Sequence, residues 1–224
     1  MSAAPRQLVL AFDHAESFAR EDFLVGPPNA AGLALIERWP DWPAPAMALV
    51  GPEGAGKSHL AAIWAEASGA RVLSAKLIGE TDLPGALATG ALVIEDLSPE
   101  AFDERALFHL LNLAREQSAF LLLTSRAPPA GFTLAIRDLA SRLRALPVVT
   151  LAPPDDALLR ALIVKLAADR QLALDEALVT FLVNRIERSY AAARAALTRM
   201  DEEAMRLHRP VTRALAADLF REIP

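Results

Sequence analysis

One eight-residue stretch has the composition and spacing of a phosphate-binding loop. Residues 51–58 read GPEGAGKS and satisfy the pattern G-x-x-x-x-G-K-[S/T], directly after an apolar run and at the start of a helix-period run. The glycines let backbone N–H groups turn inward around phosphate oxygens, and the helix N-terminus adds the positive end of its dipole. Lys57 is expected to reach the β and γ phosphates and Ser58 to ligate Mg²⁺. The loop therefore predicts a bound nucleotide with Mg²⁺.

The residues predicted to contact the nucleotide on this side are the loop and the residue that follows it: Gly51, Pro52, Glu53, Gly54, Ala55, Gly56, Lys57, Ser58 and His59. The alternative is a glycine-rich turn with an incidental lysine. Lysine is scarce in this chain, because only Lys57, Lys76 and Lys165 are lysines among the 23 lysine and arginine residues. Composition alone therefore does not explain a lysine in this loop.

Two adjacent acids follow a second apolar run. The run ends Leu92-Val-Ile94 and delivers Glu95 and Asp96 to the carboxyl edge of a predicted sheet, where open α/β sheets bind ligands. This arrangement resembles a Walker B motif, so we assign Glu95 to Mg²⁺ through water and Asp96 to the attacking water. The usual order is Asp-Glu, and the inversion is expected to weaken hydrolysis. The alternative is a strand end with two solvated acids.

Apolar runs of strand length alternate with helix-period runs through the first two thirds of the chain. The expected strands are 47–50, 72–75, 91–95, 120–124 and 147–151. The helices expected between them are 59–70, 104–117 and 134–144. This alternation predicts an α/β fold, with a mostly parallel P-loop sheet and helices on both faces.

Pro153 and Pro154 interrupt this alternation. The helices expected after them are 155–170, 175–187, 190–208 and 212–223. We therefore expect three parts: a flexible N-terminal tail over residues 1–22, a nucleotide-binding α/β domain over 23–154, and a small all-helical lid domain over 155–224. The last part is too small to bury much core alone and should pack on the second.

Composition excludes several classes of protein. The 224 residues carry no cysteine, which excludes disulfides, thiolate-bound zinc and thiol catalysis, and the four histidines lack metal-ligand spacing. The net charge of −5 and the pI near 5.4 argue against direct sequence-specific DNA binding. The sequence contains no apolar run long enough to span a membrane and no secretory signal, so we expect a cytoplasmic protein with no membrane contact.

Two segments give the chain a more specific resemblance. LLTSRAPP at 122–129 and DLASRL at 138–143 resemble the AAA+ core of the DnaA family of replication initiators, and most of all its short Hda-like regulators. The resemblance covers about residues 7–222, with weaker support from FLVGPPN at 23–29 and ALTRM at 196–200. It implies that the nucleotide is ADP or ATP. The residues it places beside the adenine are Phe23, Leu24, Val25 and Asn29.

The resemblance also assigns roles to arginines. Arg142 matches the arginine finger, a guanidinium presented to nucleotide in a neighbouring subunit, whereas a lone arginine on such a helix would be read as a solvated surface residue. Two positions depart from the family. Arg126 stands where sensor 1 has Asp, and the lid arginine of sensor 2 falls on Ala191, with Arg194 about one turn further on. We therefore expect weak intrinsic hydrolysis, with activation of a partner as the main action.

The segment QLVLAF at 7–12 is similar to the peptide with which replication proteins dock on the DNA polymerase sliding clamp. In an extended chain its apolar side chains lie on one side at period 2. The residues assigned to the clamp, the polymerase β subunit, are Gln7, Leu8, Leu10 and Phe12. The alternative for this segment is an edge strand of the core.

The resemblance implies a regulator of bacterial replication initiation. Such a protein binds adenine nucleotide, docks on the clamp and stimulates hydrolysis of ATP held by DnaA. DnaA itself has a DNA-binding domain after the lid, and the sequence to Pro224 contains none. Two alternatives remain: a helicase loader or initiator paralogue of the AAA+ class, and a stand-alone P-loop ATPase or small kinase. Whether the protein forms a homo-oligomer is left open.

Overall fold

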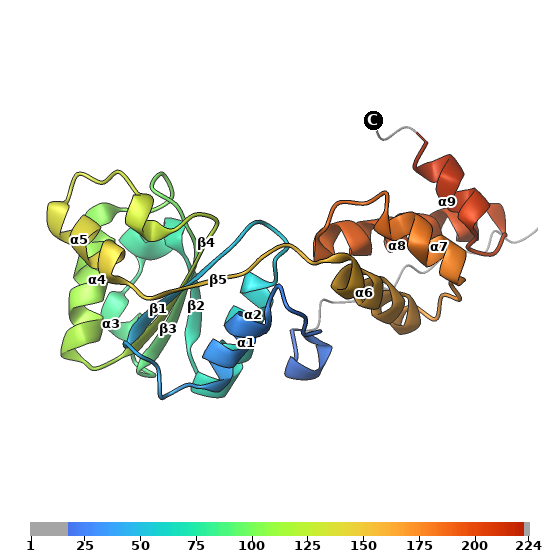
Figure 1. Cartoon of the computed structure of the whole chain (residues 1–224). Helices are drawn as coiled ribbons and strands as arrows, with labels where there is room; N and C mark the ends of the chain where they lie inside the picture. The colour runs from blue at the N-terminus through green and yellow to red at the C-terminus, as the bar shows by residue number, and fades with distance from the viewer. Residues whose placement is uncertain (1–17, 222–224) are drawn as a thin grey trace, which may run out of the picture.

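The computed structural model describes residues 18–221, and its first layer is a five-stranded parallel sheet (Figure 1). The strands are β1 (Ala46–Val50), β2 (Arg71–Ser74), β3 (Ala91–Leu97), β4 (Phe120–Ser125) and β5 (Val148–Thr150), in the spatial order β2-β3-β4-β1-β5. β1 lies between β4 and β5, so that Ala48 is opposite both Leu123 and Val148. Since all pairs are parallel, the ends of β1, β3 and β4 meet at one carboxyl edge.

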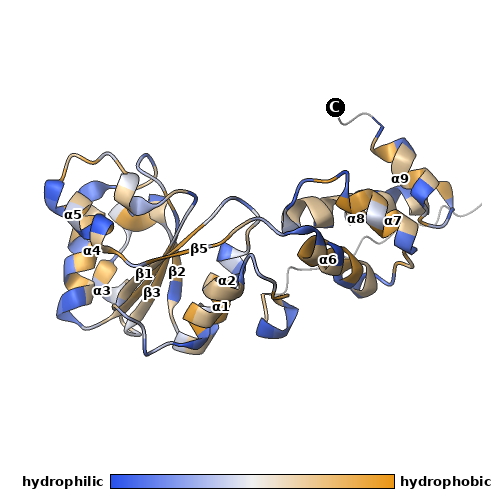
Figure 2. Ribbon diagram, viewed as in Figure 1, coloured by the Kyte–Doolittle hydropathy of each residue, from blue (hydrophilic) through white to orange (hydrophobic). Residues whose placement is uncertain are grey.

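Helices cover both faces of the sheet. The first face packs against α1 (Ala30–Glu37) and α2 (Lys57–Ser68), and the second against α3 (Leu83–Ala86), α4 (Glu104–Glu116) and α5 (Arg137–Ala145) (Figure 1). Successive residues of a strand point to opposite faces, and in β3 Leu92 and Ile94 join the second core while Val93 joins the first. Figure 2 shows the hydrophobic strands between these helix layers. The predicted α/β fold is confirmed.

Tryptophans fill the first core beside α2. The rings of Trp42 and Trp64 stack with centroids 4.9 Å apart, and the edge of Trp39 meets Phe120 at 5.8 Å. The indole N–H of Trp42 donates to the carbonyl of Leu35 at 2.8 Å, which ties the loop after α1 to that helix. These aromatic residues therefore pack the face that carries the phosphate-loop helix.

The helices after β5 form a separate layer with its own core. They are α6 (Asp156–Asp169), α7 (Glu176–Val183), α8 (Tyr190–Leu207) and α9 (Arg213–Leu219). Each begins after a residue whose side chain accepts the N–H three residues on, which satisfies one of the unpaired donors of the first turn. These capping residues are Asp155, Asp175, Ser189 and Thr212. This is the predicted helical lid, and within residues 18–221 no helix is long and apolar enough to cross a membrane.

Several element boundaries differ from those expected. Helix α5 begins at Arg137 and not at 134, because the N–H groups of Ala135 and Ile136 donate to the Glu104 carboxylate and hold that stretch outside the helix. Helix α7 ends at Val183, where the run of buried apolar residues ends. Helix α1 was not expected, although its buried positions are helically spaced. The described part of the predicted tail, residues 18–22, contains the short 3-10 helix η1 (Arg20–Asp22).

Candidate nucleotide-binding site

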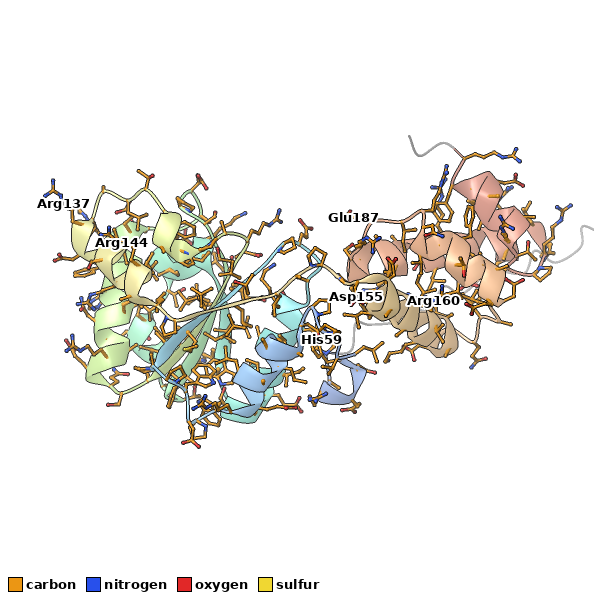
Figure 3. All side chains as sticks on the ribbon, viewed as in Figure 1. His59, Arg137, Arg144, Asp155, Arg160 and Glu187 are labelled. Atoms are coloured by element: carbon orange, nitrogen blue, oxygen red, sulfur yellow. The ribbon has the colours of Figure 1, made fainter. Side chains whose placement is uncertain are left out.

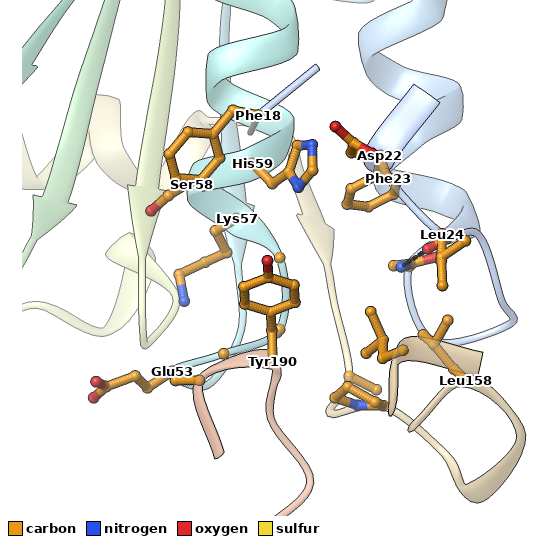
Figure 4. Close-up of a pocket in the computed structure, with 18 of the residues that line it drawn as sticks. Phe18, Asp22, Phe23, Leu24, Glu53, Lys57, Ser58, His59, Leu158 and Tyr190 are labelled. Carbon is orange, nitrogen blue, oxygen red and sulfur yellow. Dashed lines mark hydrogen bonds between the residues drawn. The ribbon is translucent and has the colours of Figure 1, made fainter. Parts of the chain in front are cut away.

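A cavity of about 400 Å³ lies between the loop that joins β1 to α2, the segment 18–29 and the lid (Figure 4). Its walls bring together residues far apart in the sequence. Those from the α/β domain that were assigned to the nucleotide are Phe23, Leu24, Asn29, Glu53, Gly54, Ala55, Gly56, Lys57, Ser58 and His59. The carboxyl edge of the sheet adds Asp96 and Arg126. The cavity is therefore at the edge where the sequence placed the site.

The loop turns through two glycines with left-handed backbone conformations. Gly54 has φ +74° and Gly56 has φ +93°, values that strain residues with a Cβ. Gly54 also approaches the lid closely, because a Cβ there would lie 2.3 Å from the Cβ of Ser189. Ser189 is buried and caps α8. The glycine therefore serves both the shape of the loop and its contact with the lid.

Lys57 is held inside the loop. Only 7% of the residue is exposed, and its ammonium donates to the carbonyls of Gly51 at 2.8 Å and Pro52 at 2.7 Å. Burial lowers the pKa of Lys57 below the ordinary value of 10.5, with Asp96 the strongest charge opposing that shift. An anion that reached this ammonium would restore the interactions that burial removes. The lysine thus brings a buried positive charge to the wall of the cavity.

The two acids near the end of β3 differ in their surroundings. Asp96 is exposed, lines the cavity, and has φ +56° at an irregularity in the pairing of β3 with β4. Its N–H donates to the hydroxyl of Thr124 at 3.1 Å. Glu95 is not among the lining residues, and its Oε1 is buried without a hydrogen-bond partner in the described part of the chain. This division between the two carboxylates could not be predicted from two adjacent acids in the sequence.

The sensor 1 position is occupied differently from the family pattern. The single O–H of Ser125 lies between two backbone carbonyl oxygens, with Oγ 2.8 Å from that of Leu97 and 2.6 Å from that of Ala127. Arg126 lines the cavity and forms an ion pair of 2.7 Å with Glu53 of the loop. Both side chains of that pair are exposed, so it contributes little to stability, on the order of 0–1 kcal/mol. It does place a second cation beside the phosphate loop.

The segment 23–29, which the sequence analysis assigned to the adenine, is anchored through Asn29. Its amide donates to the carbonyl of Leu24 at 2.9 Å and accepts from the N–H of Gly26 at 2.9 Å. The ring of His59 meets the edges of Phe18 and Phe23, with centroids 5.4 and 5.1 Å apart, and its Nε2 lies 2.9 Å from the carbonyl oxygen of Ala19. Figure 4 shows these rings at one end of the cavity. Val25 is half exposed and is not a lining residue.

The lid contributes residues that the sequence analysis did not assign to the site. Leu158 and Leu162 of α6 and Tyr190 of α8 line the cavity beside Ala191, whereas Arg194 is not among the lining residues. Figure 4 shows Tyr190 and Lys57 among the residues that line the same cavity. Apolar lid residues of this kind are hard to predict because helix-period leucines are usually core. Tyr190 had a weak signal, since it directly precedes the sensor 2 position.

An ion pair connects the lid to the residue just before the segment 23–29. Lys165 of α6 donates to Asp22 at 2.6 Å and to Asp169 at 3.1 Å. The hydrogen bond to Asp22 is the main cause that raises the pKa of Lys165 above 10.5. Asp22 itself lines the cavity. The pair therefore connects helix α6 of the lid to a residue of the cavity wall.

Arg142 lies apart from this cavity. Its guanidinium stacks over the ring of Phe108 with the centroid 4.9 Å away, and it is not one of the cavity-lining residues. Figure 3 shows Arg144, on the same helix α5, on the side of the sheet away from the lid, while His59 faces the lid. The structure thus does not bring Arg142 to the protein's own site. The clamp residues Gln7, Leu8, Leu10 and Phe12 lie outside the described residues.

The residues present fit a nucleoside phosphate with Mg²⁺. The glycine turn and the buried ammonium suit phosphates. The lid helix of 18 residues begins at the cavity and leaves room for a base beneath the lid. Ser58 and Asp96, which both line the cavity, are the candidates for Mg²⁺, which would neutralise phosphate charge. Glu95, the acid that the sequence analysis assigned to Mg²⁺, does not line the cavity. Within residues 18–221 no group of three histidine, cysteine or acidic side chains could hold a metal alone. Mg²⁺ commonly takes one or two carboxylates with phosphates and water.

The strand order, the phosphate loop and the helical lid together define an AAA+ P-loop fold. The chain is similar in structure to domain III of the replication initiation protein DnaA from Thermotoga maritima, with a TM-score of 0.74 and 20% identity, over 92% of this chain and 96% of that one. It is also similar to AMPPCP-bound DnaA from Aquifex aeolicus, with a TM-score of 0.67 and 17% identity, over 84% and 66% of the two chains.

The chain is also similar to DnaA in sequence. The chain is 28% identical to the chromosomal replication initiator protein DnaA of Thermomicrobium roseum over an alignment of 232 residues, which covers 90% of this chain and 49% of that protein. The chain therefore spans about half the length of the curated relative it matches. No protein-family model matches the chain.

Proposed function

We propose that this protein binds ADP or ATP with Mg²⁺ in the cavity under the lid and regulates replication initiation by acting on DnaA. The observation that carries nucleotide binding is the buried ammonium of Lys57, held by two carbonyls inside a glycine turn at the cavity wall. A buried charge of this kind is costly unless a partner compensates it. Similarity to DnaA over nine tenths of the chain supports the link to replication initiation.

The protein's own site is built for holding nucleotide more than for hydrolysing it. Arg126, at the sensor 1 position, pairs with Glu53, and Ala191 stands at the lid position where an arginine would meet phosphate. Both features weaken contacts to the γ phosphate, as does the Glu95-Asp96 order. We expect preference for ADP and turnover well below the roughly 1 to 100 s⁻¹ typical of kinases. Turnover in that range by the isolated protein would contradict the assignment.

The regulatory action is proposed to operate in trans through Arg142. The guanidinium is absent from the cavity of its own chain, as a group that serves a neighbour's nucleotide should be. Supplied arginines of this kind accelerate hydrolysis roughly 10³- to 10⁵-fold in nucleotide switches. The clamp peptide, residues 7–12, would bring the protein to replicating DNA.

The deciding experiment measures hydrolysis of DnaA-bound ATP with and without this protein and DNA-loaded clamp. Wild-type protein should stimulate hydrolysis, and Arg142→Ala should remove the stimulation while leaving its own ADP affinity intact. Arg144→Ala is the matched control, because Arg144 lies on the same helix and its Nε donates to the carbonyl of Ala140 at 3.2 Å. Full stimulation by Arg142→Ala, or its loss in Arg144→Ala, would show that the finger is misassigned.

The same assay separates the alternatives. A stand-alone ATPase would turn over its own ATP without effect on DnaA. A helicase loader would act on a helicase and would not require the sliding clamp. A pull-down on purified clamp gives an independent answer for the clamp peptide.

A further inference from the structure

A second hollow lies at the amino edge of the sheet, opposite the edge that bears the nucleotide cavity. Its volume is about 290 Å³, and it is lined by residues at the start of β1 and just before β5, among them Pro45, Ala46, Leu146 and Pro147. Two arginines also line it: Arg115 and Arg142. The hollow has no acidic lining residue.

The topology explains why both arginines line the same hollow. Helices α4 and α5 each follow a parallel strand and run back toward the amino edge of the sheet. Arg115 is in the last turn of α4 and Arg142 in the last turn of α5, so both helix ends deliver a guanidinium to the same place. The arrangement is thus a product of the fold and not of proximity in the sequence.

Within residues 18–221 neither guanidinium forms an ion pair with a carboxylate, whereas other arginines, among them Arg20, Arg126 and Arg160, do. Arg142 stacks on Phe108, which fixes the plane of the guanidinium and leaves its N–H edge for another group. Two like charges over an apolar floor raise the local potential and favour a multivalent anion.

We propose that Arg115 and Arg142 together bind the phosphate chain of a nucleotide held by a neighbouring AAA+ subunit, with Arg115 as a second cation beside the finger. This inference rests on the proposed function. Strand β1 has five residues and spans about 16 Å, a length that an arginine side chain cannot cross to reach its own cavity. In a head-to-tail contact two different patches meet, and one that set the amino edge of this chain against the carboxyl edge of the next subunit would bring the hollow to the neighbour's phosphate loop.

A purely stabilising role makes a different prediction. Cations in the last turn of a helix interact favourably with its dipole, by about 0.3–1 kcal/mol at exposed positions. Under that role Arg115→Ala would lower the melting temperature slightly and leave the stimulation of DnaA unchanged. Under the proposal, Arg115→Ala lowers the stimulation of DnaA while the protein remains folded.

The experiment compares Arg115→Ala, Arg115→Lys and the control Arg105→Ala in the assay of DnaA-bound ATP hydrolysis, with thermal melting and ADP affinity of each variant. Arg105 is exposed in the first turn of the same helix and does not line the hollow. Loss of one charge-assisted contact should lower the stimulated rate roughly 10- to 100-fold in Arg115→Ala, with partial rescue in Arg115→Lys and none of this effect in Arg105→Ala.

The outcomes separate the inference from the proposed function. Full stimulation by Arg115→Ala together with loss in Arg142→Ala overturns the role of Arg115 and leaves the finger in place. An equal loss in Arg105→Ala also overturns it, because the effect would then not belong to the hollow. No stimulation by the wild-type protein overturns the proposed function and, with it, the occupant assigned to the hollow.

Discussion

The contact between Gly54 and Ser189 predicts that a single methyl group will separate the phosphate loop from the lid. In Gly54→Ala the new Cβ would lie 2.3 Å from the Cβ of Ser189, at a backbone φ of +74°. The Cβ of Ser189 cannot rotate away, so the loop or the lid must shift. The left-handed conformation costs about 1–2 kcal/mol, and overpacking a close contact adds about 1–3 kcal/mol.

Gly69→Ala is a matched control for the backbone part of this cost. Gly69 ends α2 with φ +70°, nearly the same value, but a Cβ there meets nothing within 4 Å. It should therefore lose only about 1–2 kcal/mol of unfolding free energy. The difference between the two variants isolates the contact with the lid. Chemical denaturation monitored by circular dichroism measures both values.

ADP affinity is a second measurement on the same two variants. Gly54→Ala should weaken ADP affinity, because the lid residues Tyr190 and Ala191 follow Ser189 and line the cavity. Hydrogen exchange should rise at Ala192, whose N–H donates to the Ser189 hydroxyl at 3.0 Å. Gly69→Ala should leave both unchanged. Equal stability and equal ADP affinity in the two variants would refute the role given to this contact.

Three further predictions concern Lys57, Asp22 and the clamp peptide. Lys57→Ala should weaken ADP binding roughly 10- to 150-fold through loss of a charge-assisted contact. Because burial lowers the pKa of Lys57 and phosphate favours its charged form, wild-type affinity should fall as pH rises through that lowered pKa, with proton uptake on binding measured by calorimetry in two buffers. Asp22→Asn should lower the free energy of unfolding by about 1 kcal/mol. Asp169→Asn should lower it by less, because Asp169 is the more distant partner of Lys165. Because the pKa of Lys165 is raised in the folded protein, the loss of stability in Asp22→Asn should be seen below pH 10.5 and disappear only above it. Leu10→Ala with Phe12→Ala should abolish clamp capture in a pull-down while melting stays unchanged, and a large drop in melting temperature would instead indicate a core strand.

Local patterns were sufficient to predict the sheet and the phosphate loop. The strand β1 is a short buried apolar run, and the glycines and Lys57 follow it at fixed spacing, so both parts are encoded within about a dozen adjacent residues. The capped helices of the lid are encoded in the same local way, through a polar residue directly before each helical run. Fold class therefore followed from the sequence.

The parts that could not be predicted depend on contacts between distant segments. The start of α5 is set by Glu104, whose carboxylate accepts from Ala135 and Ile136 more than thirty residues later. The close approach of Gly54 to Ser189 spans the whole α/β domain and has no signature near either residue. Side-chain roles at the site were likewise set by packing, which buries an oxygen of Glu95 and leaves Asp96 at the cavity.

The two edges of the sheet impose a direction on any assembly in which the arginines act. Phosphate loop and acids lie at the carboxyl edge, while Arg115 and Arg142 lie at the amino edge. A two-fold symmetric dimer sets the same patch of both subunits face to face, so it would pair arginines with arginines. Only a head-to-tail contact sets one edge against the other. A partner that shares the AAA+ fold can provide that carboxyl edge without a second copy of this chain, which is the arrangement that the proposed action on DnaA requires.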